Sequence, residues 1–223
     1  MNNIISCEHA GNSVPENYKS LFIGAEQVLE SHRGWDPGAL EVATFLSQNL
    51  NWPLYSMRVT RLLIEMNRSL ENSELFSEFS SEISEEEKNA LLEEYYYPYR
   101  NRIEKKILNA EKPIRHFSIH TFTPIFNQVE RQVDLGLLFD PNRYSEQRTC
   151  EFMKEILEKS LPAMVIKFNE PYNGTDDGLT TSLRKKFSDD EYEGIEIEIN
   201  QKYVNSNAFS SICLALLEAI QVE

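Results

Sequence analysis

Short apolar stretches alternate with helix-like stretches along the whole chain, and this alternation constrains the fold more than any single motif does. The stretches with the length and composition of strands or extended segments are 3–7, 53–59, 61–66, 114–120, 131–139 and 163–168. Residues 194–200 alternate strictly between polar and apolar side chains, which also indicates a strand. Apolar residues at helical spacing occupy about 40–50, 84–107, 145–160 and 207–220. The sequence therefore predicts an α/β fold with a mixed, mostly parallel sheet and helices on both faces.

The size and charge of the chain limit its class. A length of 223 residues suits one domain spanning 1–223, and a hydrophobic content of 41% excludes a disordered chain. The net charge of −14 gives the long-range field the wrong sign for nucleic acids and anionic membranes, so we expect neither as a partner. We see no signal peptide and no apolar run of the ~20 residues that would cross a bilayer, and we expect a cytoplasmic protein. The oligomeric state stays open.

Two histidines occupy matching positions at the ends of predicted strands. His9 follows the apolar stretch 3–7 and begins a polar turn, and His120 ends the stretch 114–120. Ligands and chemistry gather at the carboxyl ends of strands in α/β folds. Taken alone, a histidine at a strand end is more often a hydrogen-bonded structural group. The matching positions of these two favour one site assembled from distant parts of the chain.

This pair of histidines predicts a metal site. Imidazole is a common zinc ligand, and a hydrolytic zinc site usually has three protein ligands plus water. Our first choice for the third ligand is Asp36, which we expect to cap the helix that follows it. Glu8 and His32 are the alternatives, although Glu8 should point to the opposite face from His9 if the strand continues. Asp36 also has a purely structural interpretation as a helix cap.

Further residues are candidates for proton transfer and substrate binding. Glu196 and Glu198 share one face of the predicted strand 194–200, and either is a candidate general base or part of a solvent-facing edge. If both faces of the sheet are covered, at least one of these carboxylates needs a buried partner. The candidates for binding a substrate carboxylate are Arg61, Asn67, Arg68 and Arg184. Guanidinium groups bind carboxylates in a bidentate way, although ordinary ion pairs would explain the arginines equally well.

Several of these residues belong to longer motifs that occur in a characteristic order. They are Ser-Cys-Glu-His-Ala-Gly-Asn (6–12), His-Arg-Gly-Trp-Asp-Pro-Gly-Ala (32–39), Thr-Arg-Leu-Leu-Ile-Glu-Met-Asn-Arg-Ser (60–69), Ile-His-Thr-Phe-Thr-Pro (119–124) and Glu-Ile-Asn-Gln (198–201). Together they resemble the N-formylglutamate amidohydrolase family, and the resemblance spans nearly the whole chain.

The resemblance implies a phosphorylase/hydrolase-like α/β fold, akin to that of zinc exopeptidases, and hydrolysis of the amide bond of an N-acylated amino acid. It implies one zinc or other divalent ion, with the histidine motifs on His9 and His120 and the tryptophan–aspartate motif ending at Asp36. The arginine–asparagine–arginine signature falls on Arg61, Asn67 and Arg68, and the substrate-facing loop precedes Arg184. The late-strand glutamate falls on Glu198, which makes it the preferred general base.

The main hypothesis is a zinc-dependent amidohydrolase acting on a small N-acyl amino acid similar to N-formylglutamate. A zinc amidase acting on a cell-wall peptide is the second, because a similar His and Asp-Pro-Gly-Ala arrangement occurs in such enzymes. The third is a non-catalytic protein of the same fold that binds an acyl amino acid, for which tight binding without turnover or metal would be the evidence.

Overall fold

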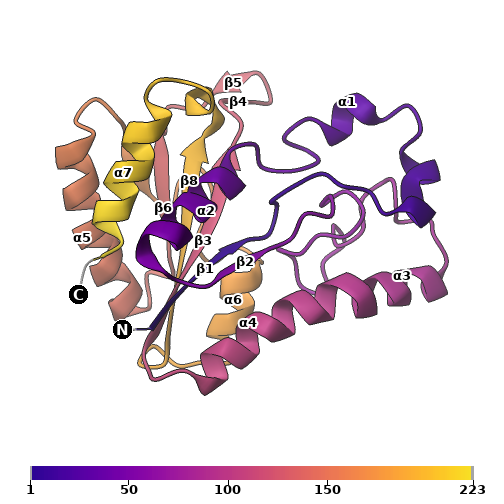
Figure 1. Ribbon diagram of the computed structural model, residues 1–223, viewed down its shortest axis with the longest axis horizontal. Helices are drawn as coiled ribbons and strands as arrows, with labels where there is room; N and C mark the ends of the chain where they lie inside the picture. The colour runs from indigo at the N-terminus through magenta and orange to yellow at the C-terminus, as the bar shows by residue number, and fades with distance from the viewer. Residues whose placement is uncertain (1, 222–223) are drawn as a thin grey trace.

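A six-stranded sheet forms the centre of the molecule in the computed structural model, which describes residues 2–221 (Figure 1). Its strands are β1 (Asn2–Cys7), β2 (Leu54–Ser56), β3 (Ile114–Phe122), β6 (Leu135–Leu138), β7 (Ile166–Phe168) and β8 (Tyr192–Asn200). The spatial order is β2-β1-β3-β8-β6-β7, and every neighbouring pair is parallel except β6 and β8. The predicted mixed, mostly parallel sheet is confirmed, although β2 and β6 are shorter than the apolar stretches that predicted them.

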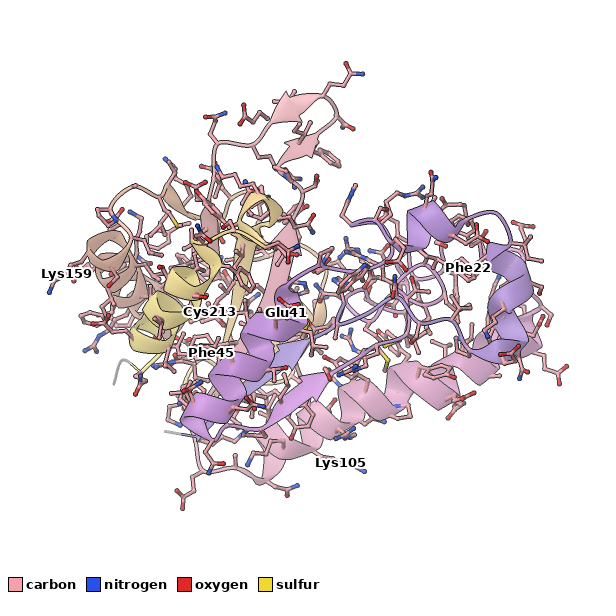
Figure 2. The ribbon with its side chains drawn as sticks, turned by 45° about the horizontal axis from the view of Figure 1, so that its top comes forward. Phe22, Glu41, Phe45, Lys105, Lys159 and Cys213 are labelled. Carbon is pink, nitrogen blue, oxygen red and sulfur yellow. The ribbon has the colours of Figure 1, made fainter. Side chains whose placement is uncertain are left out.

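Helices cover both faces of this sheet, as predicted. The helices α2 (Ala39–Leu50), α5 (Tyr144–Ser160) and α7 (Phe209–Ala219) enclose one apolar core with inward-facing strand residues such as Ile5 and Ile197. Figure 2 shows α2 and α7 side by side, with Phe45 and Cys213 labelled on them. The other core lies under α4 (Tyr97–Asn109) and α6 (Leu179–Arg184) and includes Ile4 and Ile114.

The long helix predicted around residues 84–107 consists of three joined parts. Ser84 and Glu87 form a capping box at the start of α3 (Glu85–Leu91). A π-helical segment, Leu92–Tyr96, then precedes α4, and Pro98 lies in the first turn of α4. Tyr96, at the end of this segment, donates a hydrogen bond of 2.7 Å from its hydroxyl to the backbone oxygen of Arg68. The helix thereby supports a loop that contributes to the site described below.

The remaining elements are short. They are the 3-10 helices Glu16–Phe22 and Gln201–Tyr203, α1 (Glu26–Leu29), and a hairpin of β4 (Ile125–Phe126) and β5 (Val129–Glu130). The hairpin was not predicted from the sequence, and it projects from the rest of the molecule (Figure 2). Among residues 2–221, no helix has the length and apolar character needed to cross a membrane.

Two local predictions were wrong. Asp36 does not cap α2, because the helix begins after Gly38, whose φ of 86° is strained for any other residue, and the Asp36 carboxylate faces two histidines instead. Residues 61–66 do not form a strand. The Thr60 side chain accepts a hydrogen bond from the backbone of Leu62, and the chain turns there, so its apolar residues are buried without pairing in the sheet.

Candidate active site

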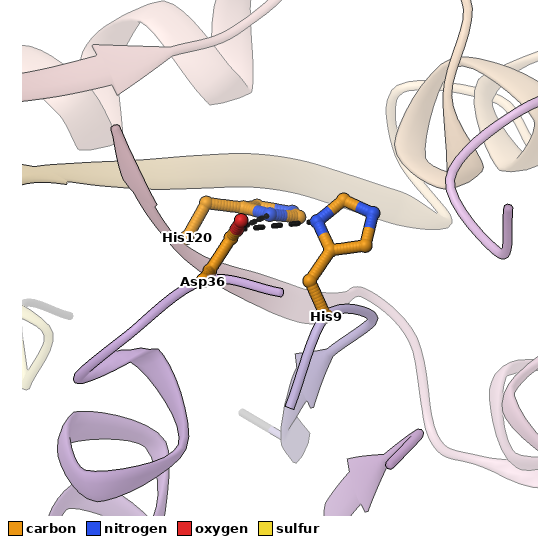
Figure 3. A group of neighbouring side chains, drawn as sticks. All are labelled: His9, Asp36 and His120. Carbon is orange, nitrogen blue, oxygen red and sulfur yellow. Dashed lines mark hydrogen bonds and ion pairs between the residues drawn. The ribbon is translucent and has the colours of Figure 1, made fainter. Parts of the chain in front are cut away.

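The pairing of β1 with β3 brings His9 and His120 together. The two strands run parallel with Ser6 opposite Ser118, so the residues at their carboxyl ends lie at the same edge of the sheet. Asp36, in the turn before α2, reaches both rings, as Figure 3 shows. Its Oδ2 lies 3.1 Å from His9 Nδ1 and 3.0 Å from His120 Nδ1, and all three residues are buried. Segments far apart in the sequence thus form one compact group.

The donor atoms of this group fit a single divalent ion. Two imidazole nitrogens and one carboxylate oxygen all lie within 4.8 Å of one another. Nitrogen and oxygen ligands of a tetrahedral zinc ion lie about 2 Å from the metal, so neighbouring ligands are about 3 Å apart, as Asp36 is from each histidine. Two imidazoles and one carboxylate are also a ligand set of hydrolytic zinc sites.

Carboxylates hold both imidazole rings from behind. His9 Nε2 lies 2.5 Å from Glu65 Oε1, and His120 Nε2 lies 3.0 Å from Glu8 Oε2. Tyr99 donates a hydrogen bond of 2.7 Å to the other oxygen of Glu8. Carboxylates placed in this way fix the orientation of metal-binding histidines and make them more basic. In this protein they direct both Nδ1 atoms toward Asp36.

These ionic contacts outweigh the cost of burial. Burial alone would raise the pKa of Glu8, but His120 holds it well below its usual range. Burial would likewise raise the pKa of Glu65, and there Arg61 and His9 lower it. Burial would lower the pKa of both histidines, yet the surrounding carboxylates raise it. The layer behind the rings therefore consists of paired charges.

Glu198 lies on the other side of His120 and has a very different environment. The two residues are opposite each other in the pairing of β3 with β8. Glu198 is only 5% exposed, and within the described part of the chain its Oε2 has no hydrogen-bond partner. Burial raises its pKa to about 8. A buried carboxyl group that titrates near neutral pH and borders a pocket is suited to accept and return a proton.

A pocket of about 150 Å³ opens in front of these residues. It is lined by His9, Asp36, Arg61, Asn67, Arg68, His120, Thr121, Tyr172, Asn173, Asp176, Asp177, Glu196 and Glu198. Tyr172, Asn173, Asp176 and Asp177, from the loop before α6, form one wall. Sequence-predicted candidates for the ligand set, the general base and carboxylate binding therefore share a single cavity.

The two pocket arginines differ in how many of their donors are engaged. Arg61 Nε and Nη2 each lie 2.6 Å from Glu65 Oε2, and its Nη1 is 3.4 Å from Asp36 Oδ1. Arg68 Nη1 donates to the backbone oxygens of Asn67 and Asp177, and its Nη2 has no partner among residues 2–221. Arg68 is thus the arginine with a donor available to a substrate carboxylate.

The family of the chain follows from comparison with known proteins. Residues 1–204 match the family model described as N-formylglutamate amidohydrolase. The chain belongs to the N-formylglutamate amidohydrolase family. Gene product Atu2144 from Agrobacterium tumefaciens has a structure similar to this chain, with a TM-score of 0.83 and 27% identity over 99% of this chain and 89% of that one.

An N-formylglutamate amidohydrolase from Ralstonia eutropha JMP134 has the same fold, with a TM-score of 0.71 and 13% identity over 99% of this chain and 93% of that one. A comparison with curated protein sequences gives no match. Membership of the N-formylglutamate amidohydrolase family, together with this fold, makes the chain an amidohydrolase by class.

The other sequence-predicted candidates of this family member lie outside the group of three. The His32 side chain is exposed and does not line the pocket, and Glu8 lies behind His120 rather than beside Asp36. Arg184 borders a different cavity. Its Nε is 2.9 Å from Glu146 Oε1, and its Nη2 donates to the backbone oxygen of Gly194 at 2.6 Å. Those contacts fasten α6 to α5 and β8 and leave Arg184 away from the pocket.

Glu65 was not predicted as a site residue, although the sequence contains a pattern that indicates its burial. Glu65 interrupts the apolar run Leu62, Leu63, Ile64 and Met66, and a charged residue in such a run needs a buried partner. His9 and Arg61 are those partners. Tyr172 and Asp176 line the pocket but were not among the predicted site residues, because nothing in the sequence shows which loop side chains face a pocket.

Proposed function

We propose that this member of the family is a divalent-metal-dependent hydrolase of small N-acyl amino acids. Its substrates would resemble N-formylglutamate in having an α-carboxylate next to a short acyl amide. The observation that carries this proposal is the position of Glu198 in one pocket with the buried group His9, Asp36 and His120. A metal ligand set and a proton acceptor of suitable pKa are the two parts that metal-assisted amide hydrolysis needs.

The group His9, Asp36 and His120 would hold the ion, for which zinc suits the donor set. A divalent ion held there would supply Lewis acidity, polarising the acyl carbonyl and making water more acidic. Glu8 and Glu65 keep the two rings in place, so the ligands need little rearrangement when an ion binds.

Glu198 performs the proton transfers in this proposal. Its free Oε2 takes a proton from the attacking water, and the same carboxyl group then donates a proton to the leaving amine. Arg68 Nη2 binds the α-carboxylate, and Asn67 assists because its Oδ1 is held by the backbone N–H of Leu179 at 2.7 Å, which leaves its NH₂ group uncommitted. These contacts orient the amide toward Glu198.

Metal analysis combined with a substrate panel tests the proposal. Purified protein is expected to contain about one divalent ion per chain, to hydrolyse at least one member of an N-formyl, N-acetyl and N-succinyl amino acid panel, and to lose that activity on chelation. Re-addition of zinc should restore the activity. Full activity after exhaustive chelation would overturn the metal dependence. Tight substrate binding with neither metal nor turnover would favour a non-catalytic binding protein.

A further inference from the structure

Apart from a bound metal ion, the lining of the pocket has five carboxyl groups and two guanidinium groups. Arg61 is neutralised by Glu65 and Asp36, so the pocket-lining cation left for a substrate is Arg68, which also lies 3.7 Å from the exposed carboxylate of Glu74. Asp177 is also committed, because its Oδ2 accepts hydrogen bonds from the backbone of Ser69 at 2.9 Å and from the Asn72 side chain at 2.7 Å. One guanidinium is enough for one substrate carboxylate.

Two pocket carboxylates, Glu196 and Asp176, have no ion pair within the described chain. Thr180 donates a hydrogen bond to Glu196 Oε1, while Glu196 Oε2 has no hydrogen-bond partner among residues 2–221. Arg184 acts on Glu196 electrostatically but forms its ion pair with Glu146. Asp176 accepts a hydrogen bond of 3.0 Å from the backbone of Asn173 and is otherwise exposed at the mouth of the pocket.

Glu196 lies on the same strand face as Glu198, two residues before it. This arrangement places a fixed negative charge beside the buried, unpartnered oxygen of Glu198, and it raises the Glu198 pKa further than burial alone does. The carboxylates on this wall of the pocket repel a second substrate carboxylate and attract a cation, because charges in a partly buried cavity are only weakly screened by solvent.

We propose that the substrate is an N-acyl amino acid with a positively charged side chain, and that Glu196 is the residue that recognises this charge. The inference rests on the proposed function, since it concerns the side chain of the same substrate. The α-carboxylate binds Arg68, the acyl amide lies at the group His9, Asp36 and His120, and the cationic end reaches Glu196. N-formylglutamate, with two carboxylates, would leave one of them facing Glu196 or Asp176.

Two pairs of near-isosteric substrates test the charge preference in the zinc-loaded protein. N-formyl-lysine is compared with N-formylnorleucine, and N-formylglutamate with N-formylglutamine, each carrying the acyl group that gives the highest turnover. We expect kcat/KM to be about 10- to 100-fold higher for the lysine derivative than for the norleucine derivative. The glutamate derivative should be at least about tenfold poorer than the glutamine derivative. A preference for N-formylglutamate over N-formylglutamine would overturn the inference.

Variants connect the preference to Glu196. Glu196→Gln should reduce the lysine-to-norleucine ratio about tenfold or more, and Asp176→Asn, on the exposed loop, should reduce it less. Glu155→Gln, which removes a negative charge from the exposed face of α5, should leave the ratio as it is. An unchanged ratio in Glu196→Gln that is folded, as judged by circular dichroism, would contradict the assignment.

Calorimetric binding of free lysine, norleucine and glutamate separates this inference from the proposed function. If none of the substrates is hydrolysed but lysine binds best and requires Glu196, the hydrolase proposal fails while the charge recognition stands. If hydrolysis requires metal but glutamate binds better than lysine, the charge recognition fails alone.

Discussion

Buried carboxylates have opposite environments in the layer behind the two histidines and in the pocket in front of them. Glu8, directly after β1, has hydrogen bonds to both carboxylate oxygens, and its pKa is held low against the effect of burial by His120. Glu198, on β8, is equally enclosed, but its Oε2 is unpaired within residues 2–221, and burial raises its pKa to about 8. The difference separates carboxylates that hold other groups in place from one that is available for chemistry.

The largest expected effect, on turnover, comes from removing the carboxylate of Glu198 in the pocket. Glu198→Gln keeps the size of the side chain but cannot accept the proton of water, so kcat of the zinc-loaded protein should fall about 10²- to 10⁴-fold. Steady-state kinetics on the best substrate, with metal content measured in the same samples, checks this. Unreduced turnover in this variant would show that the pocket carboxylate is no more available for chemistry than the carboxylates behind the rings. Glu155→Gln is the control for loss of one negative charge.

The same substitution should stabilise the metal-free protein at high pH. The folded-state pKa of Glu198 is about 8 and its ordinary value is 4.5, so between these values the folded state retains a proton that the unfolded state releases. Stability from this group is therefore fully present below pH 4.5 and is lost as the pH rises toward 8. Glu198→Gln removes that loss, on the order of 4 kcal/mol at pH 8.

Urea unfolding of chelator-treated wild type and Glu198→Gln at pH 5 and pH 8 measures this change. The variant should gain stability relative to wild type mainly at pH 8. An equal difference in unfolding free energy between the two proteins at pH 5 and pH 8 would mean that the Glu198 carboxyl group does not have a raised pKa in the folded state.

A substitution in the layer behind the rings should act on the metal. Glu65→Gln keeps an acceptor for the Asn67 backbone N–H but weakens the charged contact with His9. We expect zinc affinity to fall about 10- to 100-fold, measured by competition with a chromophoric chelator. Glu74→Gln is the matched control, because Glu74 is an exposed carboxylate 3.7 Å from Arg68. Equal affinities in the two variants would show that Glu65 does not position His9.

The smallest effect concerns His116, which is fully buried between Ser6 and Tyr192. Burial lowers its pKa to about 4, below the ordinary 6.5, so the unfolded state takes up a proton first as the pH falls. Its contribution to stability is present above pH 6.5 and is lost between about 6.5 and 4. His116→Gln should reduce the pH slope of the unfolding free energy there by up to about 1.4 kcal/mol per pH unit. Parallel slopes in denaturant titrations would contradict this.

The sheet and the pair of histidines could be predicted because each depends on local pattern. The strict alternation at 194–200 and the apolar stretches ending at His9 and His120 identify strands, and parallel strands present their carboxyl ends at one edge. The start of α2 could not be predicted in the same way. Asp36 before Pro37 has the signature of a helix cap, but two imidazoles 27 and 84 residues away in the sequence bind its carboxylate instead.

The sequence also does not show which charged residues form ion pairs with one another. Arg61 and Arg68 look equivalent in the sequence, yet Glu65 engages the first and leaves the second available. Arg184 follows the pocket loop but is tied to Glu146, from α5, a contact that depends on how α5 and α6 pack. Such choices depend on tertiary geometry that hydrophobic periodicity does not encode.

The position of β8 has a consequence for synthesis of the protein. This strand is the last of the sheet in the sequence, but it lies between β3 and β6 in space. During synthesis the candidate metal ligands His9, Asp36 and His120 therefore emerge before Glu198, the candidate proton acceptor on β8. Because β6 and β7 are joined to the rest of the sheet through β8, the sheet and the candidate pocket are complete only once this last strand is in place.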